Sequence, residues 1–256
     1  MEVTRSLWKR EFEALHFAFM GQSALCVLPR VHGETIPWLF KTEYFAAFQG
    51  LEYEMVLGGW GLAHVESLNR WGGRDDLEMK HQFMCFVAEQ FGFEQKCVPV
   101  GMSCGGLQAV KLAALHPELV SALYLDAPVI NLLSCPFGMG IGTDIDKAAQ
   151  SEALAALKLR RPEIIGYRDH PLDHLPALAR ARIPAVLVWG DADRTVPFEE
   201  NGKYVLETWR REGIPLLTDR KAGVGHHPHG PSDLRRVKVF LNEHLRVCGG
   251  VHMTDH

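Results

Sequence analysis

The sequence GMSCG at residues 101–105 has the G-x-S-x-G spacing of a turn in which a serine hydroxyl can act as a nucleophile. An apolar stretch at residues 97–100 comes directly before it, and an Ala-rich stretch at residues 107–115 follows. The glycines allow a sharp strand-to-helix turn, and the start of the helix offers free N–H groups that favour negative charge. We therefore predict Ser103 as a nucleophile, with an ordinary β–α turn as the alternative.

A serine hydroxyl needs a general base, and the base needs a group that orients it. The apolar stretch at residues 185–189 predicts a strand, and GDADRTVP at residues 190–197 follows it. Carboxylates there lie at the same edge of a parallel sheet as Ser103. We predict Asp193 as the orienting group because it reaches further into the loop, whereas Asp191 suits a hydrogen bond within its own turn.

The base is expected after one more strand, where GVGHHPHG at residues 223–230 supplies three histidines. We predict His226 as the base because it directly follows a glycine, with His227 as the alternative and His229 as a brace for the loop. Three histidines within four positions are also a pattern for a transition metal. No Glu or Cys stands beside them, and Pro228 restricts the loop, so we predict no metal and no cofactor.

The elements that must position these groups alternate along the chain, which predicts an α/β fold with a mostly parallel sheet covered on both faces. The expected strands are residues 24–28, 60–65, 97–100, 121–125, 185–189 and 215–218, and the expected helices are residues 42–57, 75–91, 107–115, 200–212 and 232–245. Residues 129–182 interrupt the alternation with a Gly-rich loop, a helix near 148–159 and a Pro-rich passage. We predict one domain over residues 1–256 with a cap-like insertion at about 129–182.

The order Ser103, Asp193, His226 and the motifs GMSCGG, GDADRTVP and GVGHHPHG resemble the α/β-hydrolase superfamily. Its bacterial esterases and prolyl-oligopeptidase-like serine hydrolases are the most similar branch, and the resemblance covers nearly the whole chain. It implies an α/β-hydrolase fold with a mainly parallel sheet of about eight strands and helices on both faces, and it makes residues 129–182 a small cap.

One departure from the family pattern concerns the oxyanion hole. The backbone N–H of Cys104 is one expected donor, because it directly follows the nucleophile. Many relatives carry His-Gly at the end of the third strand, whereas here Pro29, Arg30 and Val31 follow the strand first. Pro29 has no N–H. We therefore expect the second donor from residues 30–33, with Arg30 and Val31 as candidates.

Two tryptophans are candidates for the substrate pocket. Trp38 follows Ile36 and Pro37 at the end of the loop after the predicted strand at residues 24–28. Trp71 lies in the Gly-rich loop before the helix at residues 75–91. For both, a place in the hydrophobic core is the equal alternative. Arg70, beside Trp71, offers a charge that could steer an anionic substrate or simply be solvated.

The composition limits the classes of function. The 256 residues are 47% hydrophobic and 23% charged with a net charge of −4, which is typical of a globular protein and gives no basis for nucleic-acid binding. No signal-peptide-like stretch follows Met1, and no run approaches the roughly 20 apolar residues of a membrane span. The six cysteines lack CxxC spacing, so free thiols and a cytoplasmic location are expected.

We therefore expect a serine hydrolase that cleaves carboxylic esters of small molecules through an acyl-enzyme intermediate. A small-peptide peptidase is the first alternative, and a non-catalytic binding protein on the same fold is the second. Neither nucleic acid nor a membrane is an expected partner, and a homo-oligomer is left open. The natural acyl and alcohol groups do not follow from the sequence.

Overall fold

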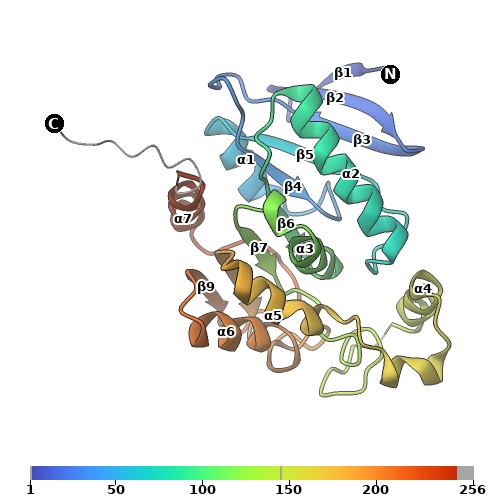
Figure 1. Ribbon diagram of the computed structural model, residues 1–256. Coiled ribbons are helices and arrows are strands. Elements are labelled where there is room, and N and C mark those ends of the chain that lie inside the picture. The colour runs from blue at the N-terminus through green and yellow to red at the C-terminus, as the bar shows by residue number, and fades with distance from the viewer. Residues whose placement is uncertain (1, 145, 247–256) are drawn as a thin grey trace.

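The computed structural model describes residues 2–144 and 146–246 of the chain. In this part, nine strands form one sheet in the order β1-β2-β3-β5-β4-β6-β7-β8-β9 (Figure 1). The strands are β1 (Thr4–Trp8), β2 (Phe12–Phe19), β3 (Gln22–Val27), β4 (Trp38–Lys41), β5 (Gly61–Val65), β6 (Val98–Met102), β7 (Leu123–Asp126), β8 (Ala185–Gly190) and β9 (Leu216–Lys221). β1, β2 and β3 pair antiparallel, β3 pairs antiparallel with β5, and the strands from β5 to β9 run parallel. The predicted fold class is confirmed.

Helices cover both faces of the sheet (Figure 1). α2 (Arg74–Phe91), α3 (Cys104–Leu115), α5 (Pro171–Ala181) and α6 (Gly202–Arg211) lie over one face, and α1 (Gly50–Leu57) and α7 (Leu234–Arg246) contribute to the core on the other. α4 (Lys147–Leu157) and the short 3-10 helices η1 (Pro117–Leu119), η2 (Arg161–Gly166) and η3 (Phe198–Glu200) complete the described elements. None of the helices in residues 2–144 and 146–246 has the length and apolar character required to cross a membrane.

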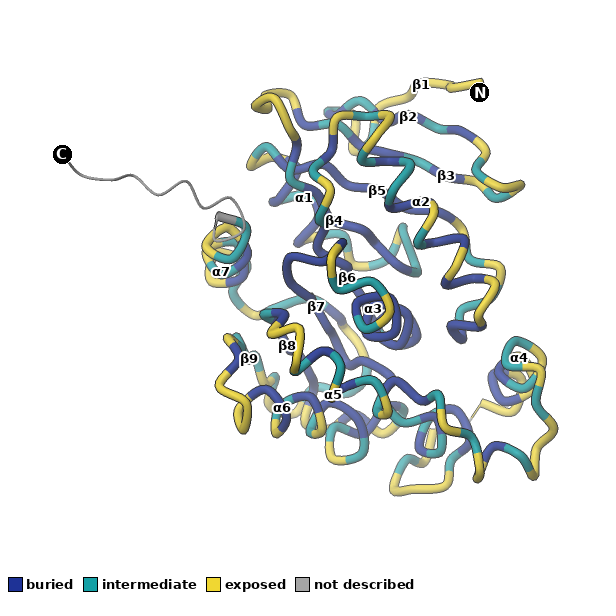
Figure 2. Tube along the Cα trace, viewed as in Figure 1, coloured by how far each residue is buried: buried dark blue, intermediate teal, exposed yellow. Residues whose placement is uncertain are grey.

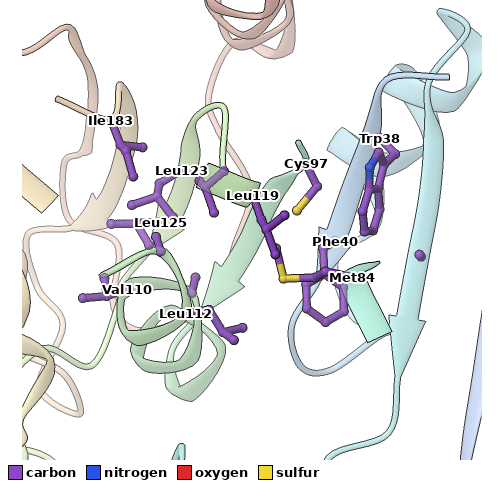
Figure 3. Packing of buried hydrophobic residues seen from close by; sticks show 14 of the residues in the cluster. Trp38, Phe40, Met84, Cys97, Val110, Leu112, Leu119, Leu123, Leu125 and Ile183 are labelled. Atoms are coloured by element: carbon purple, nitrogen blue, oxygen red, sulfur yellow. The ribbon is translucent and has the colours of Figure 1, made fainter. Parts of the chain in front are cut away.

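The central strands are buried on both sides, as expected for parallel strands between two helical layers (Figure 2). In β7, Leu123 and Leu125 pack into the core under α3, whereas Tyr124 packs into the core on the opposite face. Successive side chains of a strand point to opposite faces, so one short strand stabilises both cores. Burying each leucine contributes about 1.5–3 kcal/mol. Figure 3 shows these leucines against Val110 and Leu112 of α3.

β4 was not expected from the sequence. Its four residues are all buried, so they carry no alternation of polar and apolar residues from which a strand can be recognised. The helix predicted at residues 42–57 is correspondingly shorter, because α1 begins only at Gly50. β4 lies between β5 and β6 in the centre of the sheet, so residues 42–49 form a loop at its carboxyl end.

The segment between β7 and β8 has two parts. α4 and η2 pack around a separate hydrophobic cluster that includes Trp71 and Leu107. α5 instead packs against α3 and α6, so it belongs to the helical layer on the sheet. The predicted insertion at residues 129–182 therefore contains a crossover helix as well as the segment that extends beyond the sheet (Figure 1).

The described cysteines at positions 26, 85, 97, 104 and 135 are all free thiols. Cys248 lies outside the described residues.

Candidate active site

Ser103 lies in a strained turn between β6 and α3. Its φ of 52° and ψ of −118° are unfavourable for a residue with a Cβ atom, a strain of about 1–3 kcal/mol that the surroundings must hold. Two glycines make the turn possible. A Cβ atom on Gly101 would come 2.5 Å from the carbonyl oxygen of Gly105, and one on Gly106 would come 2.4 Å from Cβ of Pro128. The GMSCGG sequence thus produces a turn that larger residues would not allow.

The structure brings Ser103, His226 and Asp193 into one hydrogen-bonded chain. Nε2 of His226 lies 3.1 Å from Oγ of Ser103, and Nδ1 of His226 lies 2.7 Å from Oδ2 of Asp193. The carboxylate fixes the tautomer: Nδ1–H donates to Asp193, which leaves Nε2 to accept from the serine hydroxyl. The other oxygen of Asp193 accepts the N–H groups of Thr195 at 2.9 Å and Val196 at 2.8 Å. These bonds offset the burial of the carboxylate, whose side chain is only 1% exposed.

The alternative residues occupy other places. Asp191 accepts the N–H of Gly223 at 2.7 Å and pairs with Arg220 at 2.9 Å, and these hydrogen bonds hold the pKa of its carboxyl below the usual value. His227 stacks on Phe48 with ring centroids 5.7 Å apart. Neither Asp191 nor His227 has a hydrogen bond to the Ser103–His226–Asp193 chain among the contacts found in the described residues.

His229 belongs to a second histidine–carboxylate pair beside the first. Its Nδ1 lies 2.9 Å from Oδ1 of Asp126, the last residue of β7, and both side chains are nearly buried. The other oxygen of Asp126 accepts the N–H of Gly230 at 2.6 Å. This pair fixes the histidine loop to the end of β7, which agrees with the bracing role expected of His229.

Arg30 and Val31 are far from Ser103 in the sheet. β3 runs antiparallel to β5, so the chain leaves β3 at the edge where the parallel strands begin, opposite to the edge that carries Ser103. The guanidinium of Arg30 lies over the ring of Phe12, and the carbonyl of Val31 lies near Gly59, before β5. The expectation that Arg30 or Val31 supplies the second oxyanion donor is therefore wrong. It took the strand at residues 24–28 as the family's third strand, whereas the structure places β4 beside β6.

The loop after β4 lies beside Ser103 instead, because β4 is the parallel neighbour of β6. Its residue Tyr44 lines a cavity together with Ser103 and Cys104. Burial and the neighbouring Cys104 raise the pKa of the Tyr44 hydroxyl far above its usual value, so it remains a hydrogen-bond donor. Thr42 fastens the start of the loop, since its Oγ1 donates to the carbonyl of Gly105 at 2.8 Å. Tyr44 was not among the residues predicted from the sequence; the apolar run WLF before the polar KTE is the signal that could have identified it.

A buried polar network lies beneath this loop. Oγ of Ser67 donates to Glu43 at 2.5 Å, and the Lys80 ammonium donates to Ser67 at 2.5 Å and to Asp76 at 2.8 Å. The side-chain amide of Gln108, on α3, also donates to Glu43 at 3.1 Å. Burial lowers the pKa of Lys80, and the Asp76 carboxylate opposes that shift. The network ties the residue next to Tyr44 to both α2 and α3.

The cavity beside Ser103 has a volume of about 570 Å³, which includes its open mouth. It is lined by Tyr44, Arg70, Trp71, Ser103, Cys104, Ser134, Cys135, Pro136, Gly142, Asp144, Asp146, Ala149 and Thr195. Trp71 thus lines the cavity beside Ser103, and it also belongs to the hydrophobic cluster around α4. Trp38 does not line the cavity: its side chain is buried in the core, and its Nε1 donates to the carbonyl of Glu94 at 2.7 Å. Arg70 also faces the cavity, but it pairs with Glu152 at 2.7 Å.

Comparisons with known proteins match the chain by structure only. No protein-family model and no curated protein sequence matches it. Acylaminoacyl peptidase from Pyrococcus horikoshii superposes with a TM-score of 0.68 at 15% identity, over 90% of this chain and 41% of that one. A puromycin hydrolase superposes with a TM-score of 0.68 at 20% identity, over 98% of this chain and 39% of that one. S-formylglutathione hydrolase from Agrobacterium tumefaciens gives a TM-score of 0.61 at 13% identity, over 96% and 98% of the two chains.

The three similar structures differ in how much of them this chain spans. It covers about two fifths of the acylaminoacyl peptidase and of the puromycin hydrolase, and nearly all of the S-formylglutathione hydrolase. At these identities the likeness establishes the fold.

Proposed function

The chain has the α/β-hydrolase fold, and from the groups gathered around Ser103 we propose that it is a serine hydrolase that cleaves carboxylic esters of small molecules. The hydrogen-bonded chain from Ser103 through His226 to Asp193 carries this proposal. It combines a nucleophile, a base that can take its proton, and a buried carboxylate that orients the base. Its nucleophile also lines a cavity, together with Tyr44, Cys104 and Trp71.

The proposed reaction has two steps. Oγ of Ser103 attacks the ester carbonyl while Nε2 of His226 takes the hydroxyl proton, and His226 then gives that proton to the leaving alcohol. A water molecule hydrolyses the acyl-enzyme by the same route in reverse. Asp193 stabilises the imidazolium that forms in each step. The backbone N–H of Cys104 and the hydroxyl of Tyr44 are the proposed donors to the oxyanion, each worth about 3 kcal/mol.

Peptide hydrolysis is the second candidate. The acylaminoacyl peptidase is a peptidase by its name, and its likeness to this chain favours that activity. The likeness extends over only 41% of that protein, whereas the S-formylglutathione hydrolase, whose name describes the hydrolysis of a thioester, is matched over 98% of its length. This difference in coverage supports an ester as the proposed substrate. The free thiols of the described cysteines support a cytoplasmic location as part of the same proposal.

The test compares short p-nitrophenyl esters with aminoacyl p-nitroanilides on the wild type and on Ser103→Ala. We expect ester hydrolysis by the wild type and a loss of about 10⁴-fold or more in kcat in the variant, because the nucleophile is gone. Circular dichroism and Tm check that the variant is folded. A variant that keeps most of its activity would exclude Ser103 as the nucleophile. Faster cleavage of the anilides than of the esters would favour the peptidase.

A further inference from the structure

The loop after β9 gathers three imidazole rings into a triangle. The ring centroids of His226 and His227 lie 4.9 Å apart, and each lies 5.0 Å from the centroid of His229. One ligand nitrogen from each ring can be chosen so that all three lie within 4.8 Å of one another. Bracing the loop does not explain this arrangement, because His227 contributes to neither histidine–carboxylate pair.

The spacing of the rings is close to that of a metal site. Zn–N distances of about 2.0–2.1 Å place the nitrogens of a tetrahedral site about 3.4 Å apart and the ring centres about 5 Å apart. The observed centroid distances of 4.9–5.0 Å match the separation of the ring centres, and rotation of the rings is needed to bring the nitrogens from within 4.8 Å to about 3.4 Å of one another.

Two of the three histidines are also held as metal ligands usually are. Nδ1 of His226 lies 2.7 Å from a carboxylate oxygen of Asp193, and Nδ1 of His229 lies 2.9 Å from a carboxylate oxygen of Asp126. A metal-bound imidazole typically donates its other N–H to a carboxylate, which fixes the tautomer and makes the free nitrogen a better ligand. Nε2 is therefore the ligand atom that His226 and His229 can offer. We predicted no metal because no Glu or Cys stands beside the histidines and Pro228 restricts the loop. The two carboxylates come instead from the end of β7 and from the loop after β8.

We propose that His226, His227 and His229 form a binding site for a transition-metal ion of the Zn²⁺ class, and that the ion inhibits the enzyme reversibly. Three imidazoles favour Zn²⁺, Ni²⁺ or Cu²⁺ over Mg²⁺ or Ca²⁺, which prefer oxygen ligands. The buried carboxylates of Asp126 and Asp193 offset the charge of the ion. Because the ion takes Nε2 of His226, that nitrogen can no longer accept the proton of Ser103. The inhibition rests on the proposed function, whereas the binding does not.

Binding is tested by calorimetric titration of the full chain with ZnCl₂. His227→Phe removes one ligand nitrogen and keeps an aromatic ring against Phe48. The matched control is His116→Phe. His116 stacks on the ring of His81, with ring centroids 3.6 Å apart, and this replacement also keeps an aromatic ring in place. We expect one Zn²⁺ per chain in the wild type and at least tenfold weaker binding in His227→Phe, since even the outer partners of a metal site are worth about 10–100-fold. His116→Phe should bind as the wild type does.

Ser103→Ala separates the metal site from the hydrolase. It keeps all three imidazoles and removes the hydroxyl that competes with the ion for Nε2 of His226, so it should bind Zn²⁺ at least as tightly as the wild type even if the proposed activity is wrong. In the active wild type, Zn²⁺ should inhibit ester hydrolysis at the concentration at which it binds, EDTA should restore the rate, and His227→Phe should resist inhibition. Equal Zn²⁺ binding by the wild type and His227→Phe would overturn the site. Stoichiometric binding without inhibition would overturn the part assigned to His226.

Discussion

Two histidine–aspartate pairs lie side by side at one edge of the sheet, and their surroundings indicate different roles. His229 and Asp126 are both nearly buried, and their contacts hold the loop. His226 is the more exposed imidazole, at 11%, and it faces Oγ of Ser103. A base must reach its nucleophile, so the contact with Ser103 and the greater exposure of the imidazole separate the proposed base from the brace.

Tyr44→Phe tests the proposed oxyanion donor. The change removes only the hydroxyl and leaves the ring in the cavity wall. If the hydroxyl stabilises the oxyanion, kcat should fall by about 10²–10³-fold while KM changes little, because the interaction forms only in the transition state. Steady-state kinetics with a short p-nitrophenyl ester measures both parameters.

The control for this variant is Tyr53→Phe. The Tyr53 hydroxyl donates to Glu11 at 2.9 Å, and α1, which carries it, lies on the other face of the sheet. Its loss should leave kcat within about twofold, as for most surface changes. An unchanged kcat in Tyr44→Phe would mean that another group of the 42–49 loop donates to the oxyanion.

At the scale of elements, the strand that pairs with β6 decides which loop reaches Ser103, and that strand is β4 rather than β3. Residues 24–28 have the continuous apolar pattern of a buried strand, and the sequence predicts that strand correctly. The direction of β3 and its place beside β5 depend on pairing between distant residues, which no local pattern specifies. β4 has only four residues and directly follows Pro37, so its apolar run WLF is too short to be recognised as a strand from the local pattern alone.

The junction between α5 and α3 gives a prediction about stability. Just before α5, Asp169 accepts hydrogen bonds from Lys111 at 2.6 Å, from Tyr167 at 3.0 Å and from His174. Burial alone would raise the pKa of Asp169, but these hydrogen bonds outweigh burial and hold it well below its usual range. Asp169→Asn should lower the free energy of unfolding at pH 7 by about 1 kcal/mol, because the buried Lys111 ammonium loses a carboxylate partner that is itself half exposed and partly screened by solvent.

The same prediction has a defined dependence on pH. A carboxyl whose pKa is lower in the folded state stabilises the fold above the unfolded pKa of about 3.9, and this contribution is lost as the pH falls below that value. Denaturant unfolding of the wild type and Asp169→Asn from pH 7 to pH 3 should therefore give curves that converge on the acid side. A difference that stays constant, or grows towards low pH, would exclude the ionised carboxylate as the source of the stability.

At the scale of the whole molecule, the sequence predicts the three motifs in their correct places because each one combines reactive residues with its own turn signal. Ser103 follows an apolar strand and lies among glycines, and Asp193 and His226 follow strands in the same way. The cavity was harder to predict, since its walls come from loops after β4 and β5, from the start of α3 and from residues 134–149. Trp38 and Trp71 look alike in the sequence, and only the tertiary packing separates them.

That difference between the two tryptophans gives a test of the cavity as the acyl pocket. Trp71→Leu replaces an indole in the cavity wall with a smaller side chain and so enlarges the cavity. Esters of longer acyl chains should then be hydrolysed faster relative to acetate. We expect the ratio of kcat/KM for octanoate to that for acetate to rise by about tenfold or more, since pocket fit is worth about 1–3 kcal/mol per methylene group. Trp38→Leu is the matched control, because it removes a core side chain that does not line the cavity. Both variants should lower Tm, but only the first should change the ratio. An equal ratio in the wild type and Trp71→Leu would mean that the acyl chain lies elsewhere, against a wall that this tryptophan does not form.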